Sequence, residues 1–148
     1  MKKVVVANDQ GAVELTTKMV KHLESRGYEV NYLGVATETS VDYPLQAEKA
    51  CREFLKGGYE FGVLCCGTGI GIGISANKIN GIRCALVQDK MTAALAKQHN
   101  HVNFVSFGGR VTYPENPLVI LDAYINAECL HGRHDRRVTE MMDLEKKN

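Results

Sequence analysis

The sequence predicts an α/β fold in which a five-stranded parallel sheet carries helices on both faces. Short apolar segments alternate with longer amphipathic ones along the 148 residues. The apolar segments are continuous rather than alternating, as expected of strands that are covered on both sides. The length suits one domain with a substantial core, and we find no internal repeat or low-complexity segment. We therefore expect a single domain over residues 1–148 with a three-layer, Rossmann-like arrangement.

Five short apolar runs are the predicted strands, because each is bounded by polar or glycine-rich residues. In chain order they are residues 4–7, 29–33, 61–65, 83–87 and 103–107. In parallel sheets with helices on both faces, ligands bind where the carboxyl ends of the strands meet. We expect Asp9, Cys66, Asp89 and the residues after 107 to lie at that edge.

Helices are predicted between and after these strands. The first places Leu15 and Met19 on one face and has Gly27 at its end. The second follows a polar connection over residues 37–43 and has Pro44 in its first turn. In chain order the predicted helices are residues 13–25, 44–55, 75–79, 90–98, 117–126 and 136–146.

The composition is that of an ordinary soluble protein, with 45% hydrophobic and 24% charged residues. The formal net charge of +1 gives no basis for a nucleic-acid groove or for binding an anionic membrane. No apolar stretch reaches the length of a transmembrane helix, and the apolar start of the chain is too short for a signal peptide. We expect a cytoplasmic protein with neither nucleic acid nor membrane as a partner.

The chain has five cysteines in irregular positions, and no Cys-x-x-Cys pair occurs. This pattern argues against structural zinc and against a redox dithiol. In a reducing compartment a cysteine is by default a small buried hydrophobic residue, and we expect this of Cys51, Cys65 and Cys84. Cys66 is the exception because of the residues that follow it.

Cys66 opens a glycine-rich run that continues to residue 73, directly after a predicted strand. Backbone N–H groups in such a loop can hold an anion, because glycine lets a ligand approach the main chain closely. The glycine spacing matches neither the dinucleotide fingerprint nor the P-loop. A simple strand-to-helix turn is the alternative. The thiol of Cys66 and the hydroxyl of Thr68 can both move protons, which favours chemistry over binding alone.

Three other polar features could belong to a site. Asp9 follows the first strand and is about equally suited to capping a helix and to function. Residues 98–101 (Gln-His-Asn-His) precede a strand and would lie at the sheet edge near a ligand. Residues 131–137 concentrate positive charge, either as a solvated helix start or as a phosphate-binding group. The histidine pairs in the last two segments lack acidic or cysteine partners at a matching spacing, so we expect no metal.

Taken together, several segments resemble the type B ribose-5-phosphate isomerases. The wider family includes galactose-6-phosphate and allose-6-phosphate isomerases, and the similarity runs nearly from end to end. The segments that carry the resemblance are Val41-Asp42-Tyr43-Pro44, residues 66–71 continuing to Ser75-Ala76-Asn77-Lys78, Gly81-Ile82-Arg83, His99-Asn100, Gly108-Gly109-Arg110 and Gly132-Arg133-His134.

The resemblance implies an aldose–ketose isomerase that uses no metal and no cofactor. Cys66 would be the base that moves a proton between C1 and C2, and Thr68 would transfer protons at the sugar oxygens. His99 and Asp9 would open the sugar ring. The enediolate oxygen would be held by the backbone N–H groups of the loop glycines Gly67, Gly69 and Gly71.

The resemblance also implies the binding residues and the assembly. Arg133 and Arg137, together with Arg110, would hold the phosphate. Tyr43 and Asn100 would line the sugar site. Members of the family are homodimers or homotetramers whose sites are built from two chains, so we expect the C-terminal helix to pack on a partner chain.

One position departs from the family pattern. The family usually has Asp-His after the first strand, and this chain has Asp9-Gln10. That histidine is generally placed at the substrate, whereas the amide of Gln10 can donate and accept hydrogen bonds but cannot become cationic. We keep Gln10 as a substrate-binding residue, and the change leaves the identity of the sugar open.

The expected reaction is the interconversion of ribose 5-phosphate and ribulose 5-phosphate. The same reaction on allose 6-phosphate, galactose 6-phosphate or a tetrose phosphate is an alternative. A non-catalytic sugar-phosphate-binding module on the same fold is another, although it would need neither Cys66 nor Thr68 nor His99.

Overall fold

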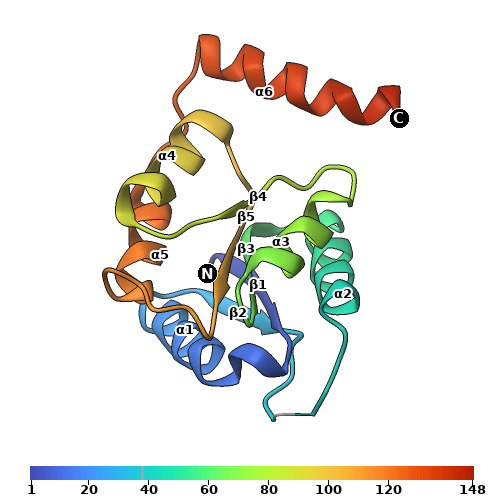
Figure 1. The fold of residues 1–148 in the computed structure, drawn as a ribbon. Coiled ribbons are helices and arrows are strands. Elements are labelled where there is room, and N and C mark those ends of the chain that lie inside the picture. Colours follow the sequence, from blue (N-terminus) through green and yellow to red (C-terminus); the bar gives the residue numbers. More distant parts are fainter. Residues whose placement is uncertain (38) are drawn as a thin grey trace.

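The computed structural model describes residues 1–37 and 39–148 and confirms the predicted fold class. Five parallel strands form one sheet in the order β2-β1-β3-β5-β4. The strands are β1 (Lys3–Asn8), β2 (Glu29–Tyr32), β3 (Tyr59–Cys66), β4 (Cys84–Leu86) and β5 (Phe104–Gly108). Figure 1 shows this sheet between two sets of helices.

The helices agree with the prediction in number and order. They are α1 (Val13–Ser25), α2 (Tyr43–Leu55), α3 (Ile70–Asn77), α4 (Lys90–Asn100), α5 (Pro117–Asn126) and α6 (Arg133–Asp143). Short 3-10 turns, η1 (Gln10–Ala12) and η2 (Leu144–Lys147), precede α1 and follow α6. The predicted polar connection over residues 37–43 includes Glu38, which lies outside the described residues.

Two predicted helix starts are wrong by three residues or more. Helix α3 begins at Ile70, five residues before the predicted start at residue 75, so half of the glycine run is helical. Helix α6 begins at Arg133 rather than at residue 136. The first turn of α3 contains glycine, which is a poor helix former. The first turn of α6 contains arginine, whose positive charge is unfavourable at a helix N-terminus.

The core has one layer on each side of the sheet because side chains along a strand alternate between its faces. Val4 and Val6 pack with apolar residues of α1, α4 and α5, whereas Val5 and Ala7 pack with those of α2 and α3. Helix α6 contributes to neither layer, and its one buried residue is His134. In Figure 1, α6 lies across the end of the molecule beyond α4.

In the described part of the chain, no helix combines the length and the apolar character needed to cross a membrane.

Candidate active site

Cys66 is the last residue of β3 and lies at the carboxyl edge of the sheet, as predicted. It pairs with Gly108 at the end of β5, and only 4% of its surface is exposed. Its Sγ accepts a hydrogen bond of 3.2 Å from the N–H of Gly69. The turn after the strand therefore folds back over the sulfur, and one backbone amide points at it.

The turn itself requires glycine. Gly69 has φ of +80°, a left-handed conformation that is costly for other residues. A Cβ at Gly67 would lie 3.0 Å from Nη1 of Arg110. The backbone N–H of Arg110 also donates to the carbonyl of Gly67 at 2.9 Å. The absence of side chains thus lets an arginine approach the turn that covers Cys66.

Thr68 lies on the outside of the same turn. It is exposed, and its Oγ1 accepts a hydrogen bond of 3.2 Å from the N–H of Ile70, the first residue of α3. Gly71 is already helical, and a Cβ there would lie 2.7 Å from the ring of Tyr43. The tyrosine ring consequently packs against the glycine run from the start of α2.

Asp9 and Gln10 approach from the end of β1. The N–H of Asp9 donates to the carbonyl of Cys65 at 3.1 Å, so Asp9 lies beside the end of β3. Its Oδ1 accepts from the N–H of Gly11 at 2.8 Å, and 6% of the residue is exposed. The Oε1 of Gln10 accepts from the N–H of Val41 at 2.9 Å, which ties the connection before α2 to this edge.

A polar cavity of about 360 Å³ opens beside these residues. Gln10 and Gly11 line one side of it, Gly109 and Arg110 line another, and the start of α1 completes it. The guanidinium of Arg110 and the side-chain amide of Gln10 are groups that recognise phosphate or hydroxyl oxygens.

Sequence reasoning missed Asn8, because the first predicted strand ends at residue 7. Asn8 is the buried last residue of β1. Its Oδ1 accepts from the hydroxyl of Tyr32 at 2.7 Å, and its carbonyl accepts from Nε2 of Gln46 at 2.9 Å. Its side-chain Nδ2 donates to the carbonyl of Val35 at 3.0 Å. The signal in the sequence is an asparagine directly after an apolar run. In the structure, the hydrogen bonds of this residue fix the backbone next to Asp9.

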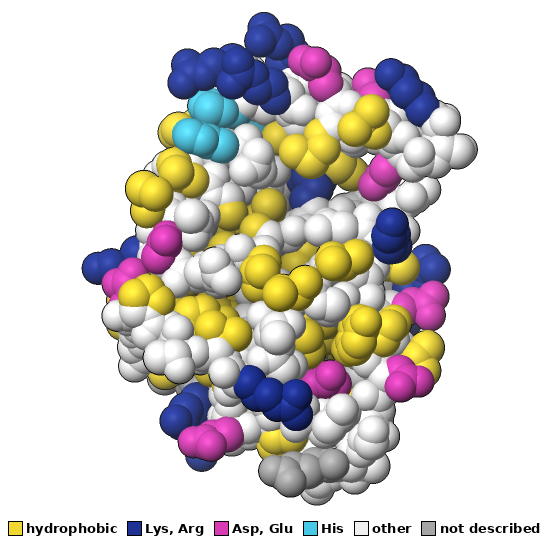
Figure 2. Space-filling view, viewed as in Figure 1, with side chains coloured by type: hydrophobic (Ala, Val, Ile, Leu, Met, Phe, Trp, Pro, Cys, Tyr) yellow, Lys and Arg dark blue, Asp and Glu magenta, His cyan; other side chains and the backbone are white. Residues whose placement is uncertain are grey.

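The remaining predicted residues form a second group at the end of α4 and the start of α6. The ring of His99 stacks on that of His134, with centroids 4.3 Å apart and planes 7° apart. Burial, together with the nearby His99 and the positive charges of Arg133 and Arg137, lowers the pKa of His134. Figure 2 shows Lys, Arg and His side chains gathered at this end of the molecule.

The two groups lie at opposite edges of the sheet. Helix α4 runs back against the strand direction, so His99 and Asn100 lie just before β5 begins at Phe104. Cys66 pairs with Gly108 at the other end of that strand. At roughly 3.3 Å per residue, β5 alone separates the two edges by about 13 Å. The structure therefore does not bring His99, Asn100, Arg133 or Arg137 to Cys66 within one chain.

Cys51 and Cys65 are buried, as the sequence predicts, whereas Cys84 is only partly buried. Burial raises the pKa of Cys51, Cys65 and Cys84 to about 12, so these thiols stay protonated at neutral pH. Among the described residues, no three His, Cys, Asp or Glu side chains are grouped so that they could hold a metal ion.

Comparisons with known proteins agree on one family. Residues 4–141 match a family described as Ribose/Galactose Isomerase. The chain is 37% identical to ribose-5-phosphate isomerase B of Escherichia coli, over 99% of each protein. Among solved structures, it resembles ribose-5-phosphate isomerase B of Clostridium thermocellum, with a TM-score of 0.94, 36% identity and 98% of each chain covered. It also resembles the type B enzyme of Leishmania infantum, with a TM-score of 0.92 and 37% identity over 99% of this chain and 97% of the other.

Proposed function

Because the chain belongs to the ribose/galactose isomerase family and is a sugar-phosphate isomerase, we propose that it interconverts ribose 5-phosphate and ribulose 5-phosphate with Cys66 as the base. The observation that carries this proposal is the backbone N–H of Gly69 pointing at the sulfur of Cys66, 3.2 Å away, at the carboxyl edge of a parallel sheet. Relatives of similar length that act on ribose 5-phosphate support the choice of sugar.

The proposed chemistry moves one proton between neighbouring carbons. The sulfur of Cys66 takes the proton from C2 of the open-chain aldose, and the electrons left behind form an enediolate. Protonation of C1 by the Cys66 thiol, while a hydroxyl proton passes from O2 to O1, gives the ketose. Thr68 lies on the same turn and supplies the hydroxyl for the second transfer. The backbone N–H of Gly69, 3.2 Å from the sulfur, holds it at the turn.

The negative oxygen of the enediolate needs donors that are already in place. We assign this role to the backbone N–H groups of Gly67 and Gly71, because the N–H of Gly69 is directed at the sulfur of Cys66 and that of Ile70 at Oγ1 of Thr68. Removing one donor of this kind typically lowers the rate on the order of 10²–10³-fold. The turn therefore contributes to catalysis as much as the base does.

The phosphate and the closed sugar ring need groups that one chain does not bring to Cys66. We infer that Arg110 of one chain acts with Arg133 and Arg137 of another to hold the phosphate. Asp9 of the first chain would work with His99 of the second to open the ring. Tyr43 and Asn100 would line the sugar from opposite sides. A symmetric pair of chains completes two such sites at once.

Exposed apolar side chains support the pairing of two chains. Ile70 and Ile74 on α3, Leu86 on β4 and Met91 on α4 are between 38% and 67% exposed. Figure 2 shows hydrophobic side chains on the face that carries α3. The edge strand β4 and its neighbouring helices thus offer an apolar surface to a second copy. Helix α6, which is largely outside the core, would pack on that copy.

Gln10 leaves other sugars to be tested. Its side-chain carbonyl accepts from the N–H of Val41, and Gln10 lines the cavity next to Arg110. A coupled assay should measure ketose formation from four- to six-carbon aldose phosphates. We expect the highest kcat/KM with ribose 5-phosphate. A higher value with allose 6-phosphate, galactose 6-phosphate or a tetrose phosphate would reassign the substrate.

The proposed residue roles can be separated by single substitutions. Cys66→Ala should abolish turnover and leave the melting temperature within a few degrees of the wild type. Arg133→Ala and Arg137→Ala should raise KM for the sugar phosphate, because each removes a charged partner of the phosphate. Full activity in Cys66→Ala would reject the base, and unchanged KM in both arginine variants would reject the phosphate site.

Mixing two inactive variants tests the shared site. Cys66→Ala and His99→Asn should each be inactive alone. A mixture that is unfolded and refolded together forms hybrid pairs in which one of the two sites is intact. With random pairing, half of the pairs are hybrids, so about a quarter of the wild-type activity should return. Recovery of no activity would place each complete site within one chain.

The expected cytoplasmic location belongs to the same proposal. A free thiol that acts as a base must stay reduced, and the cytosol keeps thiols in that state.

A further inference from the structure

His101 has an unusual backbone for its residue type. In the described part of the chain it is the one non-glycine residue with a positive φ, at 47°. It ends α4, and its N–H donates to the carbonyl of Lys97 at 3.1 Å. Glycine is the usual residue at such a helix end because it adopts this conformation without strain. A histidine here indicates that its side chain makes contacts that glycine could not make.

Arg83 holds the backbone of His101 in this conformation. Its Nε and Nη2 both donate to the carbonyl of His101, at 3.1 and 2.7 Å. Arg83 is itself fixed, because its N–H donates to Oδ1 of Asn103 at 2.8 Å. Two donors from one planar guanidinium set the direction of that carbonyl and so hold the backbone from which the imidazole extends.

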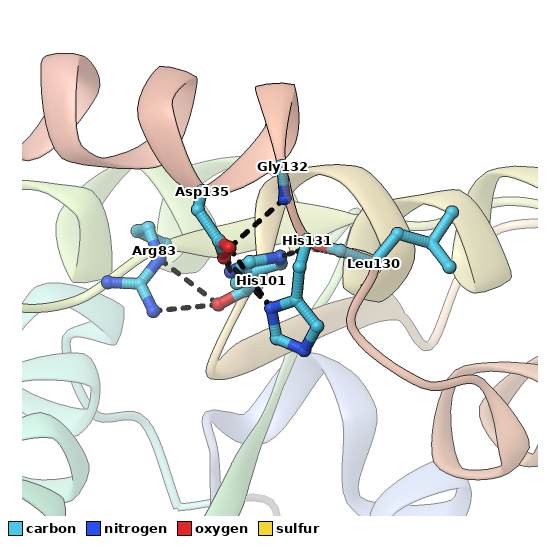
Figure 3. A network of polar contacts seen from close by, with 6 residues as sticks. All are labelled: Arg83, His101, Leu130, His131, Gly132 and Asp135. Carbon is cyan, nitrogen blue, oxygen red and sulfur yellow. Dashed lines mark hydrogen bonds and ion pairs between the residues drawn. The ribbon is translucent and has the colours of Figure 1, made fainter.

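The imidazole of His101 reaches the segment that leads into α6. Its Nε2 lies 2.7 Å from the carbonyl of Leu130 and must donate, because a carbonyl can only accept. Its Nδ1 lies 3.9 Å from Oδ1 of Asp135 on α6. Figure 3 shows His101 between Arg83 on one side and Leu130 and Asp135 on the other.

Asp135 connects this contact to the start of α6. Its carboxylate accepts from the N–H of Gly132 at 3.2 Å and lies 3.0 Å from Nδ1 of His131. The hydrogen bond from His131 is the main reason why the pKa of Asp135 is below its ordinary value. These contacts make residues 130–135 one unit. Three contacts from α4 and its end hold it: the N–H of Leu130 donates to the carbonyl of Gln98 at 2.9 Å, the ring of His99 stacks on His134, and His101 donates to the carbonyl of Leu130 (Figure 3).

The position of α6 rests on a small number of contacts. One residue of the helix, His134, is buried, where its ring stacks on His99. At the other end, Met142 contacts Arg83, and Glu145 beyond the helix accepts from the N–H of Gly81 at 2.9 Å. Between α6 and the body lies a cavity of about 420 Å³ (Figure 2). A helix supported in this way can shift if one end is released.

We propose that His101 is a positioning residue: by donating to the carbonyl of Leu130, next to Asp135, it holds the start of α6 so that Arg133 and Arg137 stay in register with His99 and Asn100. This inference rests on the proposed function, in which these four residues are presented together to a partner chain. His101 touches no substrate in this scheme. Its effect is on the affinity for phosphate, through the placement of the two arginines.

Three substitutions separate the side chain from the backbone. His101→Gly relieves the positive φ and removes the imidazole. His101→Asn also tolerates that φ, but its amide is too short to reach Leu130. His101→Gln places an amide donor near the position of Nε2 and can restore the bond to Leu130. A matched control is His22→Asn, because His22 also links two helices, through a 2.7 Å contact with Asp122, away from the proposed site.

The readouts are KM and kcat for ribose 5-phosphate, and the dissociation constant of inorganic phosphate by calorimetry. We expect the Gly and Asn variants to raise both KM and the phosphate constant about fivefold or more, with kcat within about twofold of wild type. The Gln variant and the His22 control should stay within about twofold in all three. Equal KM and phosphate binding in the Gly, Asn and wild-type proteins would overturn the proposal.

The phosphate measurement keeps this result apart from the proposed function. If the wild type failed to isomerise any sugar phosphate, phosphate binding by the His101 variants would still test the positioning role. A loss of folded protein would lower kcat without raising KM, so a purely structural role would give the opposite pattern.

Discussion

Substituting Gly69 by alanine should damage both stability and catalysis, because two separate features of the turn exclude a side chain. Gly69 has φ of +80°. A Cβ there would also lie 2.8 Å from the carbonyl carbon of Phe107, 3.0 Å from its oxygen and 2.9 Å from Leu86. The closest of these atoms belong to the backbone of a central strand, which cannot move aside easily.

The two costs can be estimated separately. The left-handed conformation costs an alanine about 1–2 kcal/mol. Steric overlap with a packed neighbour adds about 1–3 kcal/mol. The free energy of unfolding should therefore fall by about 2–5 kcal/mol in Gly69→Ala. Relief of the overlap would also move the N–H of Gly69 away from Cys66, so kcat should fall on the order of 10²-fold or more.

Gly27→Ala is the matched control. Gly27 has φ of +90°, and no atom lies within 4 Å of its Cβ position. Its substitution should cost only the conformational strain, about 1–2 kcal/mol, and should leave kcat unchanged. Urea denaturation at one fixed protein concentration measures the stabilities, and turnover is assayed where both variants are fully folded. Equal stability and equal kcat in the two variants would refute the reasoning about the turn.

Two further outcomes follow from the titrating groups. In a Cys129→Ser variant at about pH 7.5, iodoacetamide should abolish activity by modifying Cys66. Cys51, Cys65 and Cys84 should stay unmodified, because burial raises their pKa to about 12. Inactivation with label on those three cysteines and none on Cys66 would contradict the assignment. Burial raises the pKa of Asp122, but hydrogen bonds from His22 and Arg26 outweigh this and lower it. Because the pKa of Asp122 is lower in the folded protein, the carboxylate stabilises the fold at pH values above its unfolded pKa of 3.8. This stabilisation is lost as the pH falls through the folded pKa. Below about pH 4, the free energy of unfolding should therefore fall more in the wild type than in Asp122→Asn. If the free energies of unfolding of the two proteins fell in parallel with pH, the proposed effect of His22 and Arg26 on Asp122 would be contradicted.

The sheet was predictable because its signal is local. Continuous apolar runs such as residues 4–7 are typical of strands covered on both faces, and the structure has a strand at each of the five predicted places. The parallel arrangement then brings Asp9, Cys66 and Arg110 to one edge without any further information.

The start of α3 was not predictable from local preference. Gly71 and Gly73 disfavour a helix, so the run resembles a loop in sequence. In the structure, Ile72 and Ala76 pack into the core beside α2, and the close approach of Tyr43 to Gly71 requires a residue without a side chain. Tertiary packing outweighs propensity here.

The start of α6 and the location of His99 depend on contacts between distant residues. Positive charge disfavours the first turn of a helix, but the carboxylate of Asp135 accepts the N–H of Gly132 and favours that start. His99 precedes a strand, which was taken to place it near a ligand at the sheet edge. It lies at the amino edge instead, because α4 runs antiparallel to the strands.

The central claim is that the sulfur of Cys66 removes the proton from C2 of the sugar. Proton NMR of ribose 5-phosphate in D₂O measures this directly, since a proton taken up by a base exchanges with solvent before it is returned. We predict that the wild type replaces the C2 proton by deuterium and forms ribulose 5-phosphate labelled at C1. Cys66→Ala should bind the sugar phosphate and exchange nothing above the rate without enzyme. Exchange at the wild-type rate in Cys66→Ala would contradict the account.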